Sequence, residues 1–110
     1  MQRNPAVPNP NRGEVWLVDL GYTAKIRPCL VVSVHFAPDD RALIALIPHT
    51  TSVRDTRFEV SIPKPFLKTG AFDAQGLVTV SPPRLIRKLG ELQASEMELL
   101  VRALKSWLGL

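Results

Sequence analysis

The sequence predicts a mainly β protein with one C-terminal α-helix, folded as a small barrel or strongly twisted sheet with the helix lying across it. Two observations support this fold class. Five short segments rich in strand-forming residues follow one another before residue 81, and one helical pattern closes the chain. The chain has 110 residues, which is room for one hydrophobic core. We therefore expect a flexible arm over residues 1–11 and a single domain over residues 12–110.

Turn residues bound the expected strands, which cover residues 14–20, 30–36, 42–47, 57–62 and 77–80. The first ends at Gly21, and the second, with three valines in its centre, runs into a turn around Pro38. The third is apolar enough to be covered on both faces. The fourth alternates between apolar and polar residues, which is typical of a half-buried strand. The fifth stops at Pro82-Pro83.

The helix is predicted from its ends and from its periodicity. Ser95 and Glu98 form a capping-box pattern, in which a hydroxyl and a carboxylate satisfy amides of the first turn. Lys105 suits the last turn, and Gly109 is expected to end the helix. Apolar residues at helical spacing form a stripe that must pack on the sheet: Met97, Leu100, Val101, Leu104 and Trp107.

The charge balance favours an anionic partner. The chain carries 14 Lys and Arg against 10 Asp and Glu, a net charge of +4. A positive excess favours nucleic acid, because neutralising phosphates releases counterions, although many small basic proteins bind nothing anionic. The N-terminus has no apolar signal-peptide region, and no window approaches the roughly 20 apolar residues of a membrane span. We therefore expect a cytoplasmic protein without a membrane partner.

Metal and nucleotide cofactors are not expected. The sequence contains no phosphate-binding P-loop and no GxGxxG, HExxH or CxxC motif. Neither His35 nor His49 has a second ligand at metal-binding spacing. Cys29 is the single cysteine and lies in an apolar run, so we expect a buried structural thiol rather than a disulfide or a metal ligand.

Two polar clusters at expected strand ends are the candidates for chemistry. Lys25-Ile26-Arg27-Pro28 directly precedes the second strand, and residues 48–52, Pro-His-Thr-Thr-Ser, directly follow the third. If these strands pair as an antiparallel hairpin, Arg27 lies about twelve residues before the turn and Thr50 about ten after it. The count therefore brings Arg27 within reach of the segment from His49 to Thr51.

That combination suits a phosphodiester substrate. A guanidinium can neutralise the phosphorane-like transition state, and hydroxyls can hold the non-bridging oxygens. RNA supplies its own nucleophile, the 2′-hydroxyl, so neither a metal nor a serine nucleophile is required. The alternative is structural, with Arg27 in a surface ion pair and the Thr/Ser loop capping a turn. Spacing alone favours this alternative.

Four segments, taken in order, match one family. Residues 12–20 match an opening strand with a basic residue, Gly, an acidic residue, an aromatic residue and a Val-Asp pair, and residues 27–32 match an Arg-Pro-x-x-Val-Val strand. Residues 47–51 and the strand after them match a Pro-x-Thr-Thr segment and its successor, and residues 84–92 match a closing segment before a last helix. Over residues 12–108 the chain therefore resembles the MazF/PemK toxin family.

The resemblance implies an SH3-like barrel of the MazF/CcdB plasmid-maintenance-toxin type, assembled as a homodimer with RNA in the groove between subunits. It implies a type II toxin that cleaves single-stranded RNA, mRNA in particular, at a short sequence and without a metal, leaving a 2′,3′-cyclic phosphate and a 5′-hydroxyl. A cognate antitoxin with an acidic tail is also implied. Arg27 and Thr50 match the catalytic arginine and threonine. We assign Arg27 to charge stabilisation, because a guanidinium gives up its proton only at high cost, and protonation of the leaving group by Arg27 is the alternative.

The general base is left open by a departure from the family pattern. Residues 21–26 replace a longer loop that contains a serine or a glutamate acting at the site, and nothing here matches those residues. Tyr22, Thr23 and Lys25 are alternatives to them. His49, next to Thr50, is a candidate base because imidazole titrates near neutrality; the equal alternative is a loop imidazole satisfied by a neighbour.

RNA contacts are expected from polar side chains near these segments: Lys25, Thr51, Arg54, Arg57, Gln75 and Arg84. Asp73-Ala74-Gln75 stands where the family has an adjacent Asp-Gln pair, and Gln75 is the residue expected to face the groove. For Arg54 and Arg57 a solvated loop charge is the alternative.

Two other functions compete with the nuclease. One is a binding-only toxin of the same fold, like the CcdB topoisomerase inhibitors, which need no cation paired with a hydroxyl. The other is a non-catalytic module that binds RNA or a protein partner.

Overall fold

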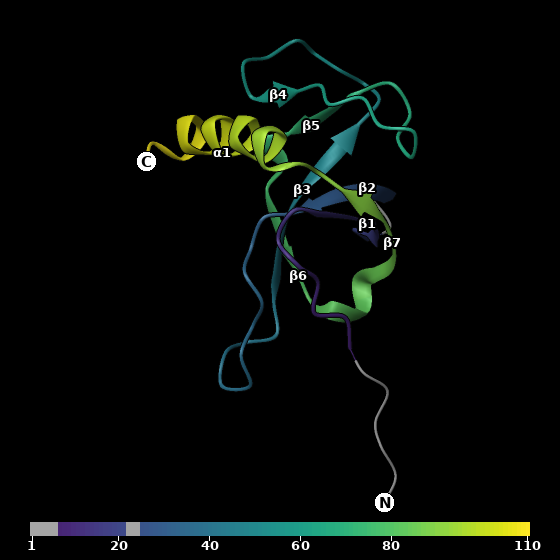
Figure 1. The fold of residues 1–110 in the computed structure, drawn as a ribbon, viewed down its shortest axis with the longest axis vertical. Coiled ribbons are helices and arrows are strands. Elements are labelled where there is room, and N and C mark those ends of the chain that lie inside the picture. The colour runs from purple at the N-terminus through teal and green to yellow at the C-terminus, as the bar shows by residue number, and fades with distance from the viewer. Residues whose placement is uncertain (1–6, 22–24) are drawn as a thin grey trace, which may run out of the picture.

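The computed structural model describes residues 7–21 and 25–110 (Figure 1). Most of the expected arm, and both Tyr22 and Thr23, lie outside the described residues. The elements in chain order are β1 (Glu14–Asp19), β2 (Ile26–Val31), β3 (Ile44–Thr50), β4 (Glu59–Val60), β5 (Ala71–Asp73), the 3₁₀ turn η1 (Ala74–Gly76), β6 (Val78–Val80), the 3₁₀ turn η2 (Pro82–Arg84), β7 (Leu85–Glu91) and α1 (Ala94–Leu108).

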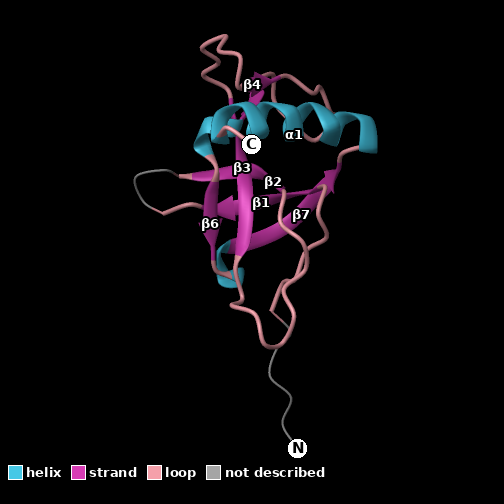
Figure 2. Cartoon of the chain, turned by 90° about the vertical axis from the view of Figure 1, so that its left-hand side faces the viewer, coloured by secondary structure: helices cyan, strands magenta, loops and turns pink. Residues whose placement is uncertain are grey.

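The predicted fold class is confirmed: the strands form one antiparallel sheet and the chain closes with one helix. The strand order is β4-β5-β3-β2-β1-β7, and β6 also pairs with β3. Figure 2 shows α1 running across the direction of β3. Within the described residues the sheet is open rather than a closed barrel, because β4 pairs only with β5 and β7 only with β1. Pro63 and Pro65 follow β4 and cannot donate to a longer ladder.

The second and third strands lie in different places from those predicted. β2 begins at Ile26 instead of residue 30, because the residue before Pro28 is held extended and joins the ladder with β1. It ends early because the Ser33 hydroxyl, rather than a backbone carbonyl, accepts the N–H of Ala45 at 2.9 Å. β3 runs on to Thr50, so residues 48–50 lie inside a strand and not in the loop after it.

Two strands, β5 and β7, were not predicted. β5 and β6 both pair with the same edge of β3: His49 pairs with Phe72 of β5, and Leu46 pairs with Val78 of β6. The chain from β5 to β6 has three more residues between these pairs than β3 has, and the additional residues form η1. β7 carries consecutive charges at Arg87 and Lys88, and its ladder with β1 shifts register twice, so its sequence shows no alternation. The fourth strand was predicted over six residues and has only two paired ones.

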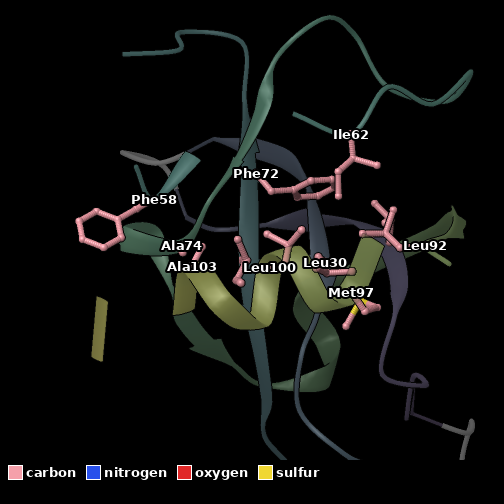
Figure 3. Packing of buried hydrophobic residues seen from close by; sticks show 11 residues of the cluster. Leu30, Phe58, Ile62, Phe72, Ala74, Leu92, Met97, Leu100 and Ala103 are labelled. Atoms are coloured by element: carbon pink, nitrogen blue, oxygen red, sulfur yellow. The ribbon is translucent and has the colours of Figure 1, made fainter. Parts of the chain in front are cut away.

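Hydrophobic side chains pack on both faces of the sheet, as strand alternation requires. One cluster lies beneath α1, where Leu30, Phe72 and Leu100 are completely buried (Figure 3). The other gathers around Cys29 and Leu46. Full burial of a Leu or Phe side chain contributes about 1.5–3 kcal/mol. The predicted burial of Cys29 is confirmed, and burial raises the pKa of its thiol to about 12.

The helix keeps its predicted core face but begins differently. Gln93, not Ser95, is the N-cap, and the Glu96 carboxylate accepts the Gln93 N–H at 2.8 Å. Met97 and Leu100 are buried, whereas the Trp107 side chain is 45% exposed and meets the edge of Phe58. The predicted stop is confirmed, because Gly109 adopts a left-handed φ of 73° that favours glycine. No helix in the described part of the chain is long and apolar enough to cross a membrane.

A buried carboxylate joins the start of β1 to β7. Glu14 accepts hydrogen bonds from the Asn11 N–H and from Trp16 Nε1, both at 3.0 Å, and lies 3.2 Å from Lys88 Nζ. Burial alone would raise the pKa of Glu14, but these bonds together lower it. Asn9 also contacts the body of the domain, through Phe36. The described part of the expected arm is therefore attached to the domain.

Candidate active site

The pairing of β2 with β3 brings Arg27 and Thr50 together. Cys29 lies across from Pro48, and continuing this antiparallel register by two residues sets Arg27 across from Thr50. Because side chains alternate along a strand, Arg27 and Thr50 project to the face that carries Cys29. Arg27 is therefore displayed within a strand, not before one as predicted, and it also pairs with Val18 of β1.

Two pockets share these side chains. The first has a volume of about 370 Å³ and is lined by Leu20, Arg27, Pro48, His49, Thr50, Asp73, Gly76 and Val78. The second has a similar volume and is lined by Arg27, Thr50, Ser52, Arg54, Thr56, Glu59, Asp73 and Gln75. Three residues border both: Arg27, Thr50 and Asp73. Each volume falls within the range of small-ligand sites.

The hydroxyl of Thr50 is oriented by its own loop. Its Oγ1 accepts the backbone N–H of Ser52 at 3.0 Å. Since a hydroxyl that accepts through its oxygen can still donate its hydrogen, Thr50 presents a donor toward the pocket. A donor next to a guanidinium suits an anionic oxygen.

The wall of the second pocket is held by Glu59. Its two carboxylate oxygens accept the backbone N–H of Arg54, at 3.2 and 3.0 Å, and one of them also accepts the N–H of Thr56 at 2.7 Å. The bond from Arg54 is the main reason that the pKa of Glu59 is lowered. Glu59 thus organises the loop that presents Arg54, and both of its oxygens are occupied.

A third pocket, of about 560 Å³, also reaches Arg27 and is strongly basic. Its charged lining residues are Lys25, Arg27, Lys68 and Arg87, and it has no Asp or Glu. His49 and Thr51 contribute polar groups, while Phe66 is among its apolar side chains. Arg27 is therefore the residue at which the three pockets meet.

His49 is oriented differently from Thr50. His49 borders the first pocket, but it is only 4% exposed. Its ring lies edge-on to Phe72, with ring centroids 5.0 Å apart. Strand alternation places it on the face of β3 opposite to Thr50. Its Cε1 would lie 2.7 Å from a Cβ added at Gly70, so the ring packs directly on that backbone. Burial lowers the pKa of His49.

The predicted RNA contacts divide into two groups. Lys25, Thr51, Arg54 and Gln75 line pockets that contain Arg27. Arg57 lies over the Phe58 ring, and Arg84 lies 3.9 Å from Asp19; neither lines one of these pockets.

Among the polar residues of these pockets, sequence reasoning missed Thr56, Glu59 and Lys68, and it assigned no role to Asp73. Asp73 stands two residues before Gln75 in the sequence, but its strand was not predicted, so nothing indicated which face it occupies. Within residues 7–21 and 25–110, no three His, Cys, Asp or Glu side chains come together as a metal-binding group.

Comparisons with known proteins agree on one group. A family model described as PemK-like, MazF-like toxin of type II toxin-antitoxin system matches residues 11–108. An endoribonuclease in complex with its cognate antitoxin, from a mycobacterial species, is 31% identical with a TM-score of 0.79, over 92% of this chain and 96% of that one. A second mycobacterial endoribonuclease is 28% identical with a TM-score of 0.77, over 94% and 95%.

A MazE-MazF complex from Deinococcus radiodurans is 26% identical with a TM-score of 0.73, over 96% of this chain and 99% of that one. No curated protein sequence matches significantly.

Proposed function

Because the chain belongs to the PemK-like, MazF-like toxins of type II toxin-antitoxin systems, we propose that it is an endoribonuclease that cleaves single-stranded RNA, mRNA in particular, at a short sequence and without a metal. The observation that carries the proposal is the pocket shared by Arg27 and Thr50, which sets a fixed positive charge beside a hydroxyl donor. The similarity to endoribonucleases over nearly the whole chain supports it.

In the proposed reaction the 2′-oxygen attacks the adjacent phosphorus while the bond from phosphorus to the 5′-oxygen breaks. The 2′-hydroxyl gives its proton to a base, and the departing 5′-oxygen receives a proton, so the products are a 2′,3′-cyclic phosphate and a 5′-hydroxyl. Arg27 neutralises charge that develops on the non-bridging oxygens, and Thr50 donates a hydrogen bond to one of them. The guanidinium supplies the positive charge that a metal ion would otherwise provide.

The RNA strand is proposed to pass Arg27 and to use the cations on either side of it. Arg54 and Gln75 border the pocket on one side, and Lys25 and Thr51 border the basic pocket on the other. Arg57 and Arg84 are proposed to touch the strand outside the pockets. The same basic surface suits the acidic tail of a cognate antitoxin, a partner that is present in two of the similar structures. A homodimer is part of this proposal.

Cleavage of a mixed-sequence single-stranded RNA in EDTA tests the proposal. We expect the Arg27→Ala and Thr50→Val variants to cleave about 100- to 1000-fold more slowly, because each removes a group that stabilises transition-state charge. Arg41→Ala is the matched control and should cleave at the wild-type rate, because Arg41 is exposed and lines none of the pockets around Arg27.

Three results would contradict the proposal. Loss of cleavage in EDTA would show that the reaction needs a metal ion. Equal cleavage rates for the wild type and Arg27→Ala would show that Arg27 takes no part in catalysis. Growth arrest by the wild-type protein while cellular RNA stays intact selects a binding-only toxin instead.

A further inference from the structure

The basic pocket, of about 560 Å³, combines apolar surface with positive charge. Leu17 of β1 pairs with Pro28 of β2 and with Arg87 of β7, and paired residues project to the same face of a sheet. The segment between β4 and β5 adds Phe66 and Lys68 to the lining. Three strands and one loop, far apart in the sequence, therefore build this pocket together.

A glycine in β7 makes room for the Phe66 ring. Gly90 pairs with Val15, which belongs to the core beneath α1. A Cβ added at Gly90 would lie only 2.7 Å from Cζ of Phe66 and closer still to Cε1, well inside the 3.5–4.0 Å of favourable carbon contacts. The ring therefore packs directly on the backbone of β7. Because Phe66 is only half-buried and lines the pocket, this packing holds an aromatic surface at the pocket wall.

The cations around Phe66 are exposed and face no carboxylate in the pocket. Among the ion pairs of the described residues, none includes Lys25, Lys68 or Arg87, whereas Lys88, next to Arg87, pairs with Glu14. All three cations are exposed, and the pocket is lined by no Asp or Glu. A group of cations without opposite charge attracts phosphates.

The basic pocket adjoins the candidate active site around the end of β3. Arg27 lines both, and β3 ends at Thr50, which lines the first pocket. The residues on either side of it, His49 and Thr51, line the basic pocket. A strand of RNA that holds one phosphate at Arg27 therefore brings a neighbouring nucleotide to the basic pocket.

We propose that the basic pocket binds a nucleotide adjacent to the cleaved phosphate, with its base stacked on Phe66 and its outer phosphate held by Lys68 and Arg87; this inference rests on the proposed function. Every base has an aromatic face, so one aromatic side chain and nearby cations are the usual means of holding a single-stranded nucleotide. The stacked base fixes the register of the strand, and this register sets the next phosphate at Arg27.

The aromatic ring also favours a nucleotide over an acidic peptide as the occupant. Carboxylates on a peptide need only the cations, whereas a nucleotide uses the cations and the ring together. The continuity with Arg27 adds to this preference, because RNA is the proposed substrate there.

The Phe66→Leu variant of the full chain tests stacking. Leucine keeps apolar packing on β7 but has no ring to stack. We expect the affinity for an uncleavable 2′-O-methyl RNA to fall about tenfold, the size of one stacking contact. Phe36→Leu is the matched control, because Phe36 is also half-buried and lines none of the pockets around Arg27. This control should bind RNA like the wild type, and the melting temperature of each variant reports any loss of stability.

RNA with one base removed separates stacking from a structural effect. Once the cleavage position is mapped, an abasic nucleotide is placed in turn on each side of it in the 2′-O-methyl RNA. At the position that occupies the pocket, loss of the base should weaken wild-type binding about tenfold but weaken Phe66→Leu binding less than about twofold. Partners in one contact give such non-additive losses, whereas independent effects add.

Gly90→Ala moves the ring without removing it. The added methyl group has to displace the far end of the Phe66 side chain. We expect RNA affinity to fall about fivefold or more in the otherwise wild-type chain. In the Phe66→Ala background the same change should have less than about a twofold effect, because no ring is left to displace. Equal effects in both backgrounds would contradict a role for the ring.

The phosphate contacts are tested by salt dependence. Lys68→Gln and Arg87→Gln should each reduce the magnitude of the slope of log affinity against log salt concentration by about 0.7, the value for one phosphate of a single strand. Lys105→Gln is the control, since Lys105 is exposed on α1 and lines none of the pockets around Arg27. An unchanged slope for Lys68→Gln and Arg87→Gln would contradict the proposed phosphate site.

The outcomes separate this inference from the proposed function. If the wild-type protein cleaves no RNA, the proposed function fails. If the wild-type protein cleaves RNA but Phe66→Leu binds it normally, or the losses from Phe66→Leu and from base removal add at both positions, the pocket does not hold a stacked base and the nuclease assignment stands. If Phe66→Leu and Arg87→Gln weaken binding of a poly-glutamate peptide but not of RNA, the pocket serves an acidic peptide instead.

Discussion

At the scale of single residues, the alternation of β3 separates two adjacent polar side chains. Thr50 and His49 both line the first pocket with Arg27, but the His49 ring packs on Phe72 and the backbone of Gly70. Burial lowers the pKa of His49 from its ordinary value of 6.5. The native state therefore favours the neutral imidazole, and the role of His49 as a base stays a prediction that its variants can test.

His49→Gln should change stability with a distinct pH dependence. Because the folded pKa lies below the unfolded one, the native wild-type protein is destabilised as the pH falls from about 6.5 toward the folded pKa. At pH 7.5 the variant should lose about 1–3 kcal/mol of unfolding free energy through lost packing. Its loss of stability on acidification to pH 5.5 should be smaller than that of the wild type. Urea denaturation at several pH values measures both effects.

His35→Gln is the matched control, because His35 is exposed, and this variant should keep the wild-type free energy of unfolding at pH 7.5 to within about 0.5 kcal/mol. For a packing role, cleavage by His49→Gln should stay within about tenfold of wild type. A loss of 100-fold or more, the size expected for a general base, would instead support His49 in catalysis.

At the scale of elements, the start of α1 shows how a neighbouring segment selects a helix cap. The Glu96 carboxylate accepts the N–H of Gln93 and also lies 2.8 Å from Lys64 Nζ. The bond with Lys64, followed by that with Gln93, lowers the pKa of Glu96. Lys64 lies in the segment after β4, so this ion pair joins the first turn of the helix to that segment.

Paired substitutions distinguish the observed cap from the predicted one. Glu96→Ala should lower the free energy of unfolding by roughly 1–2 kcal/mol, since it removes a capping bond and a partly buried ion pair. Ser95→Ala should change it by less than about 0.5 kcal/mol, because Ser95 is exposed and lies within the helix. Urea denaturation at pH 7 compares the two. A larger loss of unfolding free energy for Ser95→Ala than for Glu96→Ala would instead support the predicted capping box of Ser95 and Glu98.

At the scale of the whole molecule, cations from distant parts of the chain collect around one point. Lys25 precedes β2, Arg54 lies before β4, Lys68 precedes β5 and Arg87 belongs to β7, yet each lines a pocket that contains Arg27. These pockets therefore contain more cations than carboxylates, which are Glu59 and Asp73, and this distribution suits a polyanionic strand.

Salt dependence should reveal which cations contact RNA. For single strands, the plot of log affinity against log salt concentration has a slope of about −0.7 per neutralised phosphate. Lys25→Gln and Arg54→Gln should each reduce the magnitude of that slope by about 0.7, measured with 2′-O-methyl RNA so that no cleavage occurs. Arg41→Gln, which removes an exposed charge that lines none of the pockets around Arg27, should leave it unchanged. Equal slopes for all the variants would place the strand elsewhere.

Sequence alone determined the features that depend on local pattern. The segments of β1 and β6, the buried positions Met97 and Leu100, and the stop at Gly109 all follow from periodicity or turn chemistry within a few residues. Counting outward from one hairpin was also enough to bring Arg27 near Thr50, because an antiparallel ladder conserves the sum of paired residue numbers.

Only the tertiary structure decided the features that depend on a partner strand. β5 has three residues, too few to show a period, and it exists because β3 and β4 flank it. The pairing of β5 determines the face of the sheet on which Asp73 lies. In the same way, the extension of β3 to Thr50 places His49 and Thr50 on opposite faces. A strand has a two-residue period, so one residue of shift exchanges its faces. The residues that meet in the pocket therefore depend on how strands distant in sequence pair with one another, and no local sequence pattern encodes that pairing.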